Sequence, residues 1–268
     1  GLDGVDLRGS PIDPGLERRA ARWVSTYLSG GGTEKNENIP AFLSVPVSPE
    51  LPPRRRNTVR KFSGVLIVVP VFKDVGATEA CLQSLCKTIF GSRKGGRKKI
   101  FSIEILVVDD ASPDVLMCEM LAGFEARGFV RVLRLAENLG FPGAVNVGLE
   151  QAGDRDVVLL NSDTYVTEGW LAGLLRVAEA APDHGTVTPF SNDATILSYP
   201  GLTGNAVPDH RLADEFSVFM SEANGNSYIE IPTAHGFCML IRNDCLREVG
   251  YLREDVFAQG YGEENDFC

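Results

Sequence analysis

The sequence lacks the signatures of several common sites and segments. It has only three histidines, and its six cysteines form no C-x-x-C pair, which argues against a zinc site. Its longest apolar run, residues 65–72, is far shorter than the roughly 20 residues that a membrane-spanning helix needs. No secretory signal pattern is visible at its start. We therefore expect reduced thiols and a cytoplasmic protein.

A basic excess is also missing. The chain has 26 Lys and Arg against 36 Asp and Glu, a formal net charge of -10. General nucleic-acid binding needs a basic face, so we expect no nucleic-acid partner. A nucleotide is compatible with this charge, because a few local groups or a metal ion suffice to hold its phosphates. No G-x-G-x-x-G motif follows any predicted strand, which weakens the case for a dehydrogenase.

The first 60 residues differ in character from the rest. Residues 13–29 have apolar side chains at helical spacing, and a Pro-rich stretch with the basic run RRRNTVRK follows them. We interpret residues 1–60 as an N-terminal helix with a Pro-rich linker, and residues 61–268 as one domain.

Strands and helices alternate over the first part of this domain. The pattern predicts strands at 65–72, 103–110, 130–138, 156–163 and 185–190, separated by helices at 77–90, 114–127, 142–152 and 168–181. Such alternation is typical of an α/β protein with a mostly parallel sheet covered on both faces. Residues 191–230 look loop-rich, and a strand at 235–242 and a short helix at 243–250 follow.

Polar side chains end two of these strands. The second strand runs into Asp109, Asp110 and Ser112, and the fourth ends in the segment Asn161–Asp163. Sheets of this kind bind ligands at the carboxyl ends of their strands. A carboxylate cluster there suits a hard divalent cation such as Mg²⁺ or Mn²⁺, which prefers oxygen ligands and shares them with phosphates. The alternative for the Asp109–Asp110 pair is a helix-capping role.

From residue 65 to its end the chain resembles the family two glycosyltransferases with the GT-A fold. The resemblance rests on six motifs in the expected order: VPVF, VVDDAS, NLGFPGAVNVG, LLNSDTYVTEGWL, HGFCMLIR and GYGEENDF. It implies a Rossmann-like sheet and an inverting transfer of a sugar from a nucleotide diphosphate to an acceptor hydroxyl. The family usually continues beyond the point where this chain stops, so the domain is expected to be C-terminally incomplete.

The resemblance implies a donor site built from several loops. Asp109 matches the aspartate that hydrogen-bonds the nucleotide base, with Pro70 and Phe72 beside it. Asn138 matches the loop beside the nucleotide, as do Gly140 and Asn146 in the helix that follows.

The metal site departs from the family pattern. Asp163 matches the last acid of the D-x-D motif, which binds the metal on the diphosphate, but Asn161 stands where the first acid usually is. An amide supplies no negative charge, although it can hydrogen-bond a ribose hydroxyl. The resemblance therefore implies a Mg²⁺ or Mn²⁺ ion held by Asp163, phosphates and water.

The resemblance also implies a general base. The family has a Glu-Asp pair at a helix start, and its second acid deprotonates the acceptor. Glu263 and Glu264 stand there, so Glu264 takes this place. His235 is expected to be a packed side chain near a strand start.

The implied partners are a UDP- or dTDP-sugar donor and a glycan or lipid-linked acceptor, in a bacterial cell-surface polysaccharide type of pathway, with peripheral association at the inner face of the membrane. Two alternatives stay open. A binding module that keeps the nucleotide-sugar pocket without turnover is compatible with Asn161. A sugar nucleotidyltransferase would share the sheet and the metal, but it would want a Gly-rich basic loop after the first strand, where this chain has only Lys73 and Gly76.

Overall fold

The computed structural model describes residues 62–91, 102–199, 205, 209–224, 227–257 and 262–268. The helix predicted at 13–29 and the linker after it lie outside the described residues. The boundary between residues 60 and 61 therefore stays a prediction. The chain divides into two compact units, of which the larger includes the described residues up to Pro189 and the segment Ile231–Cys268, and the smaller includes Phe190–Glu230.

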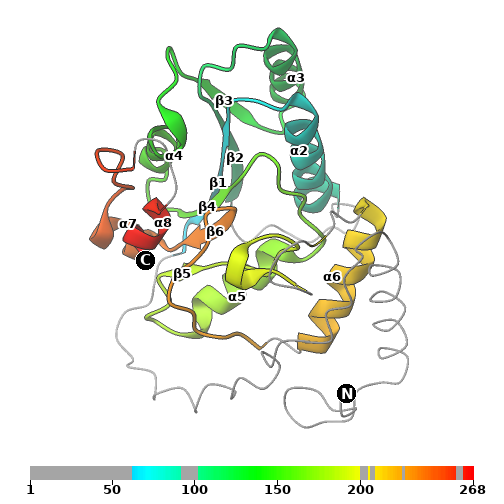
Figure 1. Cartoon of the computed structure of the whole chain (residues 1–268), viewed down its shortest axis with the longest axis vertical. Coiled ribbons are helices and arrows are strands. Elements are labelled where there is room, and N and C mark those ends of the chain that lie inside the picture. Colours follow the sequence, from blue (N-terminus) through cyan, green and yellow to red (C-terminus); the bar gives the residue numbers. More distant parts are fainter. Residues whose placement is uncertain (1–61, 92–101, 200–204, 206–208, 225–226, 258–261) are drawn as a thin grey trace. The chain divides into compact units, whose positions relative to one another are not determined.

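The larger unit is built on one six-stranded sheet with the order β3-β2-β1-β4-β6-β5 (Figure 1). Its strands are β1 (Gly64–Val71), β2 (Ser102–Asp109), β3 (Arg131–Arg134), β4 (Asp156–Leu160), β5 (Thr186–Val187) and β6 (Cys238–Ile241). Strands β1 to β4 pair in parallel, and β6 runs antiparallel to both of its neighbours. The start of β6 therefore lies at the same edge as the carboxyl end of β4, with Leu160 opposite Cys238.

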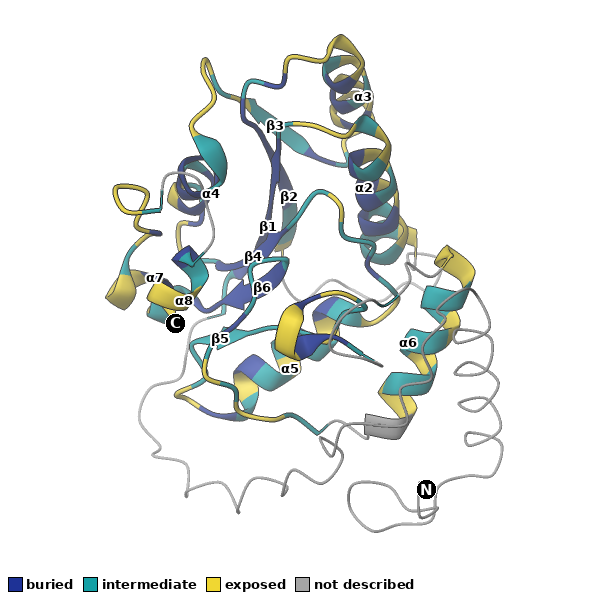
Figure 2. Cartoon of the chain, viewed as in Figure 1, coloured by how far each residue is buried: buried dark blue, intermediate teal, exposed yellow. Residues whose placement is uncertain are grey.

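Helices cover both faces of this sheet. The face packed by α2 (Val75–Phe90), α3 (Val115–Ala126) and α5 (Trp170–Ala180) forms one apolar core. The opposite face packs against α4 (Gly140–Glu150), α7 (Asn243–Val249) and α8 (Glu263–Phe267) and forms the second. All eight residues of β1 and all five of β4 are buried (Figure 2), as expected for central strands with a core on each side. The predicted mostly parallel α/β fold is confirmed.

Helix α4 packs closely against the sheet at Gly148, where the absence of a side chain makes the contact possible. A Cβ atom on Gly148 would lie 2.3 Å from Val68 Cγ1 and 3.4 Å from Val108 Cγ2. No side chain larger than hydrogen fits there without moving the helix or a central strand.

Two helices on the other face begin with aspartate caps. The Asp74 carboxylate accepts a hydrogen bond from Ala77 N at 2.9 Å at the start of α2, and Asp114 accepts one from Leu116 N at 2.9 Å at the start of α3. Both bonds satisfy amide groups that a first helical turn leaves without partners.

The sequence patterns misjudged one segment and several ends. Residues 191–230 were expected to be loop-rich, but the smaller unit contains α6 (His210–Asn224). The helix is rich in polar residues, and turn-forming Gly, Asn and Pro residues flank it, so the segment looks like a loop although its apolar side chains recur at helical spacing. Strands β3, β4 and β5 are shorter than predicted, because the pairing ends at Arg134, Leu160 and Val187, before the last residues of the predicted ranges.

None of the described helices is long and apolar enough to cross a bilayer. All six cysteines are free thiols.

Candidate active site

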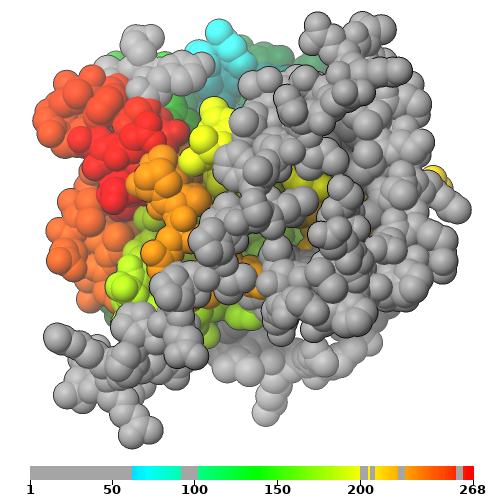
Figure 3. All heavy atoms as spheres, turned by 60° about the horizontal axis from the view of Figure 1, so that its bottom comes forward, coloured from blue at the N-terminus to red at the C-terminus, as the bar shows by residue number. Residues whose placement is uncertain are grey.

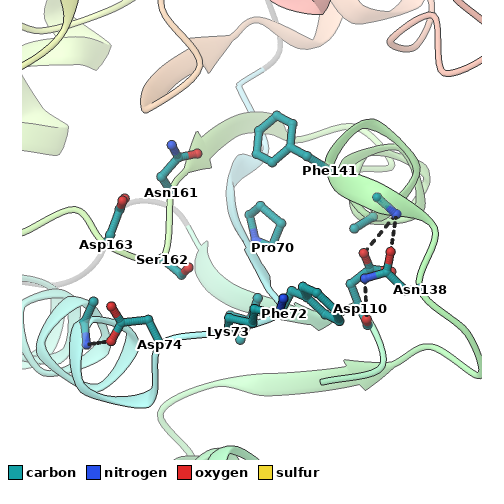
Figure 4. Close-up of a pocket in the computed structure, with 14 residues that line it drawn as sticks. Pro70, Phe72, Lys73, Asp74, Asp110, Asn138, Phe141, Asn161, Ser162 and Asp163 are labelled. Atoms are coloured by element: carbon teal, nitrogen blue, oxygen red, sulfur yellow. Dashed lines mark hydrogen bonds between the residues drawn. The ribbon is translucent and has the colours of Figure 1, made fainter. Parts of the chain in front are cut away.

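A cleft of about 400 Å³ opens at the carboxyl edge of the sheet, over the ends of β1, β2 and β4 (Figure 4). It lies wholly within the larger unit. Its lining combines apolar, amide and acidic groups: Pro70, Val71, Phe72, Lys73, Asp74, Ala77, Asp110, Asn138, Gly140, Phe141, Ala144, Asn161, Ser162 and Asp163. A cleft thus lies at the carboxyl edge where a ligand site is predicted, and segments up to about 90 residues apart in sequence form it.

The end of β1 forms the floor of the cleft. Pro70 is buried and Phe72 is half-buried. Lys73 Nζ lies over the Phe72 ring, 4.9 Å from its centroid. On the far side Phe141 extends into the cleft from the first turn of α4 (Figure 4). These side chains provide apolar surfaces on which a planar ring could stack.

Asp109 is held by the protein itself. It is only 1% exposed, its Oδ1 accepts a hydrogen bond from Ser112 N at 2.9 Å, and its Oδ2 accepts one from Arg134 Nη1 at 2.6 Å. It is not among the described residues that line the cleft. Its predicted contact with a nucleotide base stays a prediction, and it would require lone pairs of the carboxylate that these two donors leave free.

Asp110, the next residue, does line the cleft and anchors α4. Its Oδ1 accepts from Leu139 N at 2.7 Å and its Oδ2 from Gly140 N at 3.0 Å, although it is only 3% exposed. Asn138 supports the same turn, because its Oδ1 also accepts from Gly140 N, at 3.2 Å. Asp110 thus has the helix-capping role that is the plain alternative for such an acid, and it shapes one wall of the cleft.

The segment after β4 forms the opposite wall. Asn161 N donates to Phe237 O at 2.9 Å, which fixes this segment to the start of β6. The Asn161 side-chain Oδ1 is buried and has no hydrogen-bond partner, whereas Asp163 is exposed at the cleft. An orphaned amide oxygen beside a carboxylate is a place where a ligand would supply the missing partner.

This wall fits a cation only in part. Among the described residues no three His, Cys, Asp or Glu side chains gather to hold a metal ion. Asp163 and the orphaned Asn161 oxygen are both hard oxygen donors of the type that Mg²⁺ and Mn²⁺ prefer. A divalent cation therefore fits here if the ligand's own phosphates complete its coordination.

Glu264 lies beside the start of β6 rather than in the lining of the cleft. The position of a Cβ on Gly236 would be 3.8 Å from Glu264 Cδ, so this carboxylate packs against the segment that leads into Phe237. His235 is half-buried, and its ring centroid lies 5.5 Å from that of Phe237. One short segment thus contacts Glu264 on one side and Asn161 on the other.

Glu263 differs sharply from its neighbour. It is 4% exposed, its Oε2 has no hydrogen-bond partner, and burial together with the nearby Glu264 carboxylate raises its pKa. The C-terminal segment, coloured red, reaches the molecular surface in the space-filling view (Figure 3).

The structure thus unites most of the predicted donor-site residues. Pro70, Phe72, Asn138, Asn161 and Asp163 share the cleft, and Asp109 and Glu264 lie outside its described lining. The sequence patterns pointed to Asp110 only as part of a pair, and they gave no direct signal for Phe141 or Asp74, both of which line the cleft.

Comparison with known proteins identifies the fold family. A family model described as glycosyl transferase family 2 matches residues 66–250. The chain belongs to this family. The match covers the strands, helices and loops that form the cleft, and it confirms the resemblance inferred from the six motifs.

One curated relative and two solved structures are informative. The low-salt glycan biosynthesis hexosyltransferase Agl10 of Haloferax volcanii is 25% identical over 142 residues, which is 49% of this chain and 42% of that protein. The match therefore spans less than half of the relative's length.

The solved structures share the fold. Mannosyltransferase PcManGT from Pyrobaculum calidifontis, in complex with GDP-Man and Mn²⁺, has a TM-score of 0.51 at 17% identity over 94% of this chain and 62% of that one. S. aureus TarS 1-349 has a TM-score of 0.50 at 21% identity over 76% of this chain and 53% of that one. Both support the GT-A assignment of the α/β fold.

Proposed function

We propose that this chain transfers a sugar from a nucleoside-diphosphate donor to an acceptor hydroxyl, with inversion at the anomeric carbon. The observation that carries the proposal is the cleft at the carboxyl edge of the sheet. There Pro70 and Phe72 offer an apolar surface, while the orphaned Asn161 oxygen and the Asp163 carboxylate face a ligand from the opposite wall. Membership of glycosyl transferase family 2 supports the same reading.

The base of the nucleotide lies, in this proposal, against Pro70 and Phe72, and the diphosphate extends toward Asp163. UDP or dTDP is the expected nucleotide. GDP joins the test because PcManGT was solved with GDP-Man. Asn138 lies on the same wall as Asp110, where its Nδ2 donates to Asp110 O at 3.3 Å and its Oδ1 accepts from Gly140 N at 3.2 Å, so a contact with the nucleotide would use the hydrogen-bonding capacity that these two bonds leave free. Asn161 is expected to hydrogen-bond a ribose hydroxyl or a ligand of the cation.

A Mg²⁺ or Mn²⁺ ion would be held by Asp163 and the donor diphosphate. Asn161 Oδ1, which has no hydrogen-bond partner, would be a further, neutral oxygen ligand. When bound, such an ion neutralises the charge that grows on the leaving diphosphate. Because Asn161 adds no negative charge, we expect weaker metal binding than with two acids.

Glu264 is proposed as the general base. Its carboxylate takes the proton of the acceptor hydroxyl while the acceptor oxygen bonds to the anomeric carbon and the bond to the diphosphate breaks. Attack from the side opposite the leaving group inverts that carbon. The packing of Glu264 on Gly236, one residue from the Phe237 carbonyl that holds Asn161, supports a base facing the sugar from beyond the cleft wall.

The acceptor is proposed to be a glycan or a lipid-linked glycan. Support comes from Agl10, whose name assigns it to low-salt glycan biosynthesis as a hexosyltransferase. A cytoplasmic location, with peripheral association at the inner face of the membrane, belongs to the same proposal and would give access to such acceptors. Assembly of a bacterial cell-surface polysaccharide is the corresponding pathway proposal.

A panel of UDP-, dTDP- and GDP-sugars with and without MnCl₂ tests the proposal. We expect one nucleotide to raise the melting temperature in a Mn²⁺-dependent manner and its sugar to be released slowly by hydrolysis. A thermal shift without nucleotide release would instead support the binding module, which the amide at Asn161 favours. Pyrophosphate release from a sugar 1-phosphate and a nucleoside triphosphate would support a nucleotidyltransferase, and no response to any nucleotide would refute all three.

A further inference from the structure

The side chain of Asn146 joins two parts of the larger unit that are 106 residues apart in sequence. Its Oδ1 accepts from Leu252 N at 2.9 Å, and its Nδ2 donates to Leu252 O at 2.9 Å and to Glu254 Oε2 at 3.2 Å. The residue is only 9% exposed. The oxygen and the nitrogen of one side-chain amide therefore both bond the backbone of Leu252. The Glu254 carboxylate can only accept, so it fixes the orientation of the amide, with Nδ2 toward Glu254.

On its own side, Asn146 belongs to the helix that forms a wall of the cleft. Gly140, Phe141 and Ala144 of α4 line that cleft. The helix has other strong attachments, because Asp110 caps its start and Gly148 packs directly on Val68. Loss of the Asn146 contact would therefore leave this wall in place.

On the other side, the amide holds Leu252 and Glu254, which precede α8 in the sequence. The remaining backbone hydrogen bonds described for residues 250–257 are local, such as Glu254 N to Leu252 O at 2.9 Å and Phe257 N to Arg253 O at 2.9 Å. Leu252 and Phe267, 5% and 6% exposed, belong to the same core cluster. Because both side chains belong to this core, we expect a shift of Leu252 to be transmitted through the core to Phe267, and so to α8, which carries Glu264.

We infer that Asn146 is a positioning residue, which sets the Glu264-bearing segment in register with the nucleotide cleft. The inference rests on the proposed function, and it assigns to Asn146 a role apart from the nucleotide contact suggested by its motif. Only asparagine has the required length together with one acceptor and two donors. Alanine would leave the Leu252 N–H unpaired in a buried place.

A second asparagine provides a matched control. Asn243 Nδ2 donates to Gly153 O at 2.8 Å and to Arg155 O at 3.0 Å, so it is also an amide that ties distant backbone together. These partners precede β4, at the edge of the sheet away from the cleft. Asn146→Ala and Asn243→Ala should both lower stability, but only the first should affect the proposed base.

The experiment compares the two variants by calorimetry of UDP with MnCl₂, by UDP-glucose hydrolysis and by amide hydrogen exchange. For Asn146→Ala we expect the UDP dissociation constant to stay within about twofold and kcat to fall by about tenfold or more, with faster exchange in residues 262–268 and unchanged exchange in residues 138–144. For Asn243→Ala we expect none of these changes. If Asn146→Ala is poorly folded, Glu254→Ala, which removes one of the three bonds at an exposed residue, should give a smaller loss of kcat in the same direction.

Unchanged kcat and exchange in Asn146→Ala, or weaker UDP binding with unaltered kcat, would overturn the inference. Equal effects in both variants would also overturn it, because they would reveal a general loss of stability. If the wild type hydrolyses no donor, the proposed function fails, and the exchange pattern alone then decides whether Asn146 controls the order of α8.

Discussion

Replacing Asp110 by asparagine tests the account of how the cleft wall is anchored. The Asp110 carboxylate, 3% exposed, accepts from two amide groups, Leu139 N at 2.7 Å and Gly140 N at 3.0 Å. An asparagine keeps one accepting oxygen and turns an NH₂ group toward the other N–H. Gly140 N retains a second acceptor, Asn138 Oδ1 at 3.2 Å, so the net loss is one charge-assisted bond. Such a bond contributes about 1.5–3 kcal/mol, and we expect the free energy of unfolding to fall by about 2 kcal/mol.

Urea unfolding followed by circular dichroism measures this loss, with an unchanged m value as the sign that only stability has changed. Asp114→Asn is the control, because the Asp114 carboxylate is exposed and makes one capping bond, to Leu116 N at 2.9 Å. Asparagine caps helices about as well as aspartate, so the control should lose less than about 0.5 kcal/mol. Equal losses in the two variants, or a loss below about 0.5 kcal/mol for Asp110→Asn, would refute the anchoring role.

Three further predictions concern the acidic groups. Glu264→Gln should lower turnover by about 10²–10⁴-fold while the donor still binds. Asp266 is an exposed acid on the same helix, so Asp266→Asn should keep turnover within about twofold. Steady-state kinetics measure turnover in both variants, and calorimetry measures donor binding. Asp163→Asn should weaken Mn²⁺-dependent nucleotide binding by about tenfold or more and leave binding in EDTA unchanged. Asn161→Asp should increase the gain in nucleotide affinity that Mn²⁺ provides. Equal nucleotide affinities of the wild type with and without Mn²⁺ would contradict both expectations. Burial raises the pKa of Glu263 above its ordinary value of 4.5, so the folded state loses stability as the pH rises through that value. Glu263→Gln should therefore be more stable than the wild type at pH 7, and this difference in stability should disappear well below pH 4.5. A difference in urea unfolding that does not change with pH would contradict the expectation.

The alternation of strands and helices was predictable because it depends on local chemistry. The β-branched run that ends at Val71 is buried on both faces, as a central parallel strand must be. The polar groups at Asp110 and Asn161 mark where two strands stop, and parallel strands bring those ends to one edge. Helix α6 was missed because its composition is polar and turn-forming residues flank it, although its apolar side chains do recur at helical spacing.

Non-local pairing explains what the sequence could not reveal. The Arg134 guanidinium that engages Asp109 is 25 residues away, and whether it reaches the carboxylate depends on the register of β3 beside β2. The bonds between Asn146 and Leu252 span 106 residues and depend on how Leu252 and Glu254 pack against α4. The family resemblance implied a place for Asn146 in the helix beside the nucleotide, which stays a prediction, and the described contacts of its side chain tie α4 to Leu252 and Glu254.

The most direct test of the central claim is a crystal structure of the chain grown with UDP-glucose or GDP-mannose and MnCl₂, with calorimetry showing that the nucleotide is bound. We expect a diphosphate and a cation beside Asp163, the nucleotide base against Pro70 and Phe72, and the sugar directed toward Glu264. A nucleotide bound elsewhere on the chain, or one seated in this cleft with its diphosphate turned away from Asp163, would contradict it.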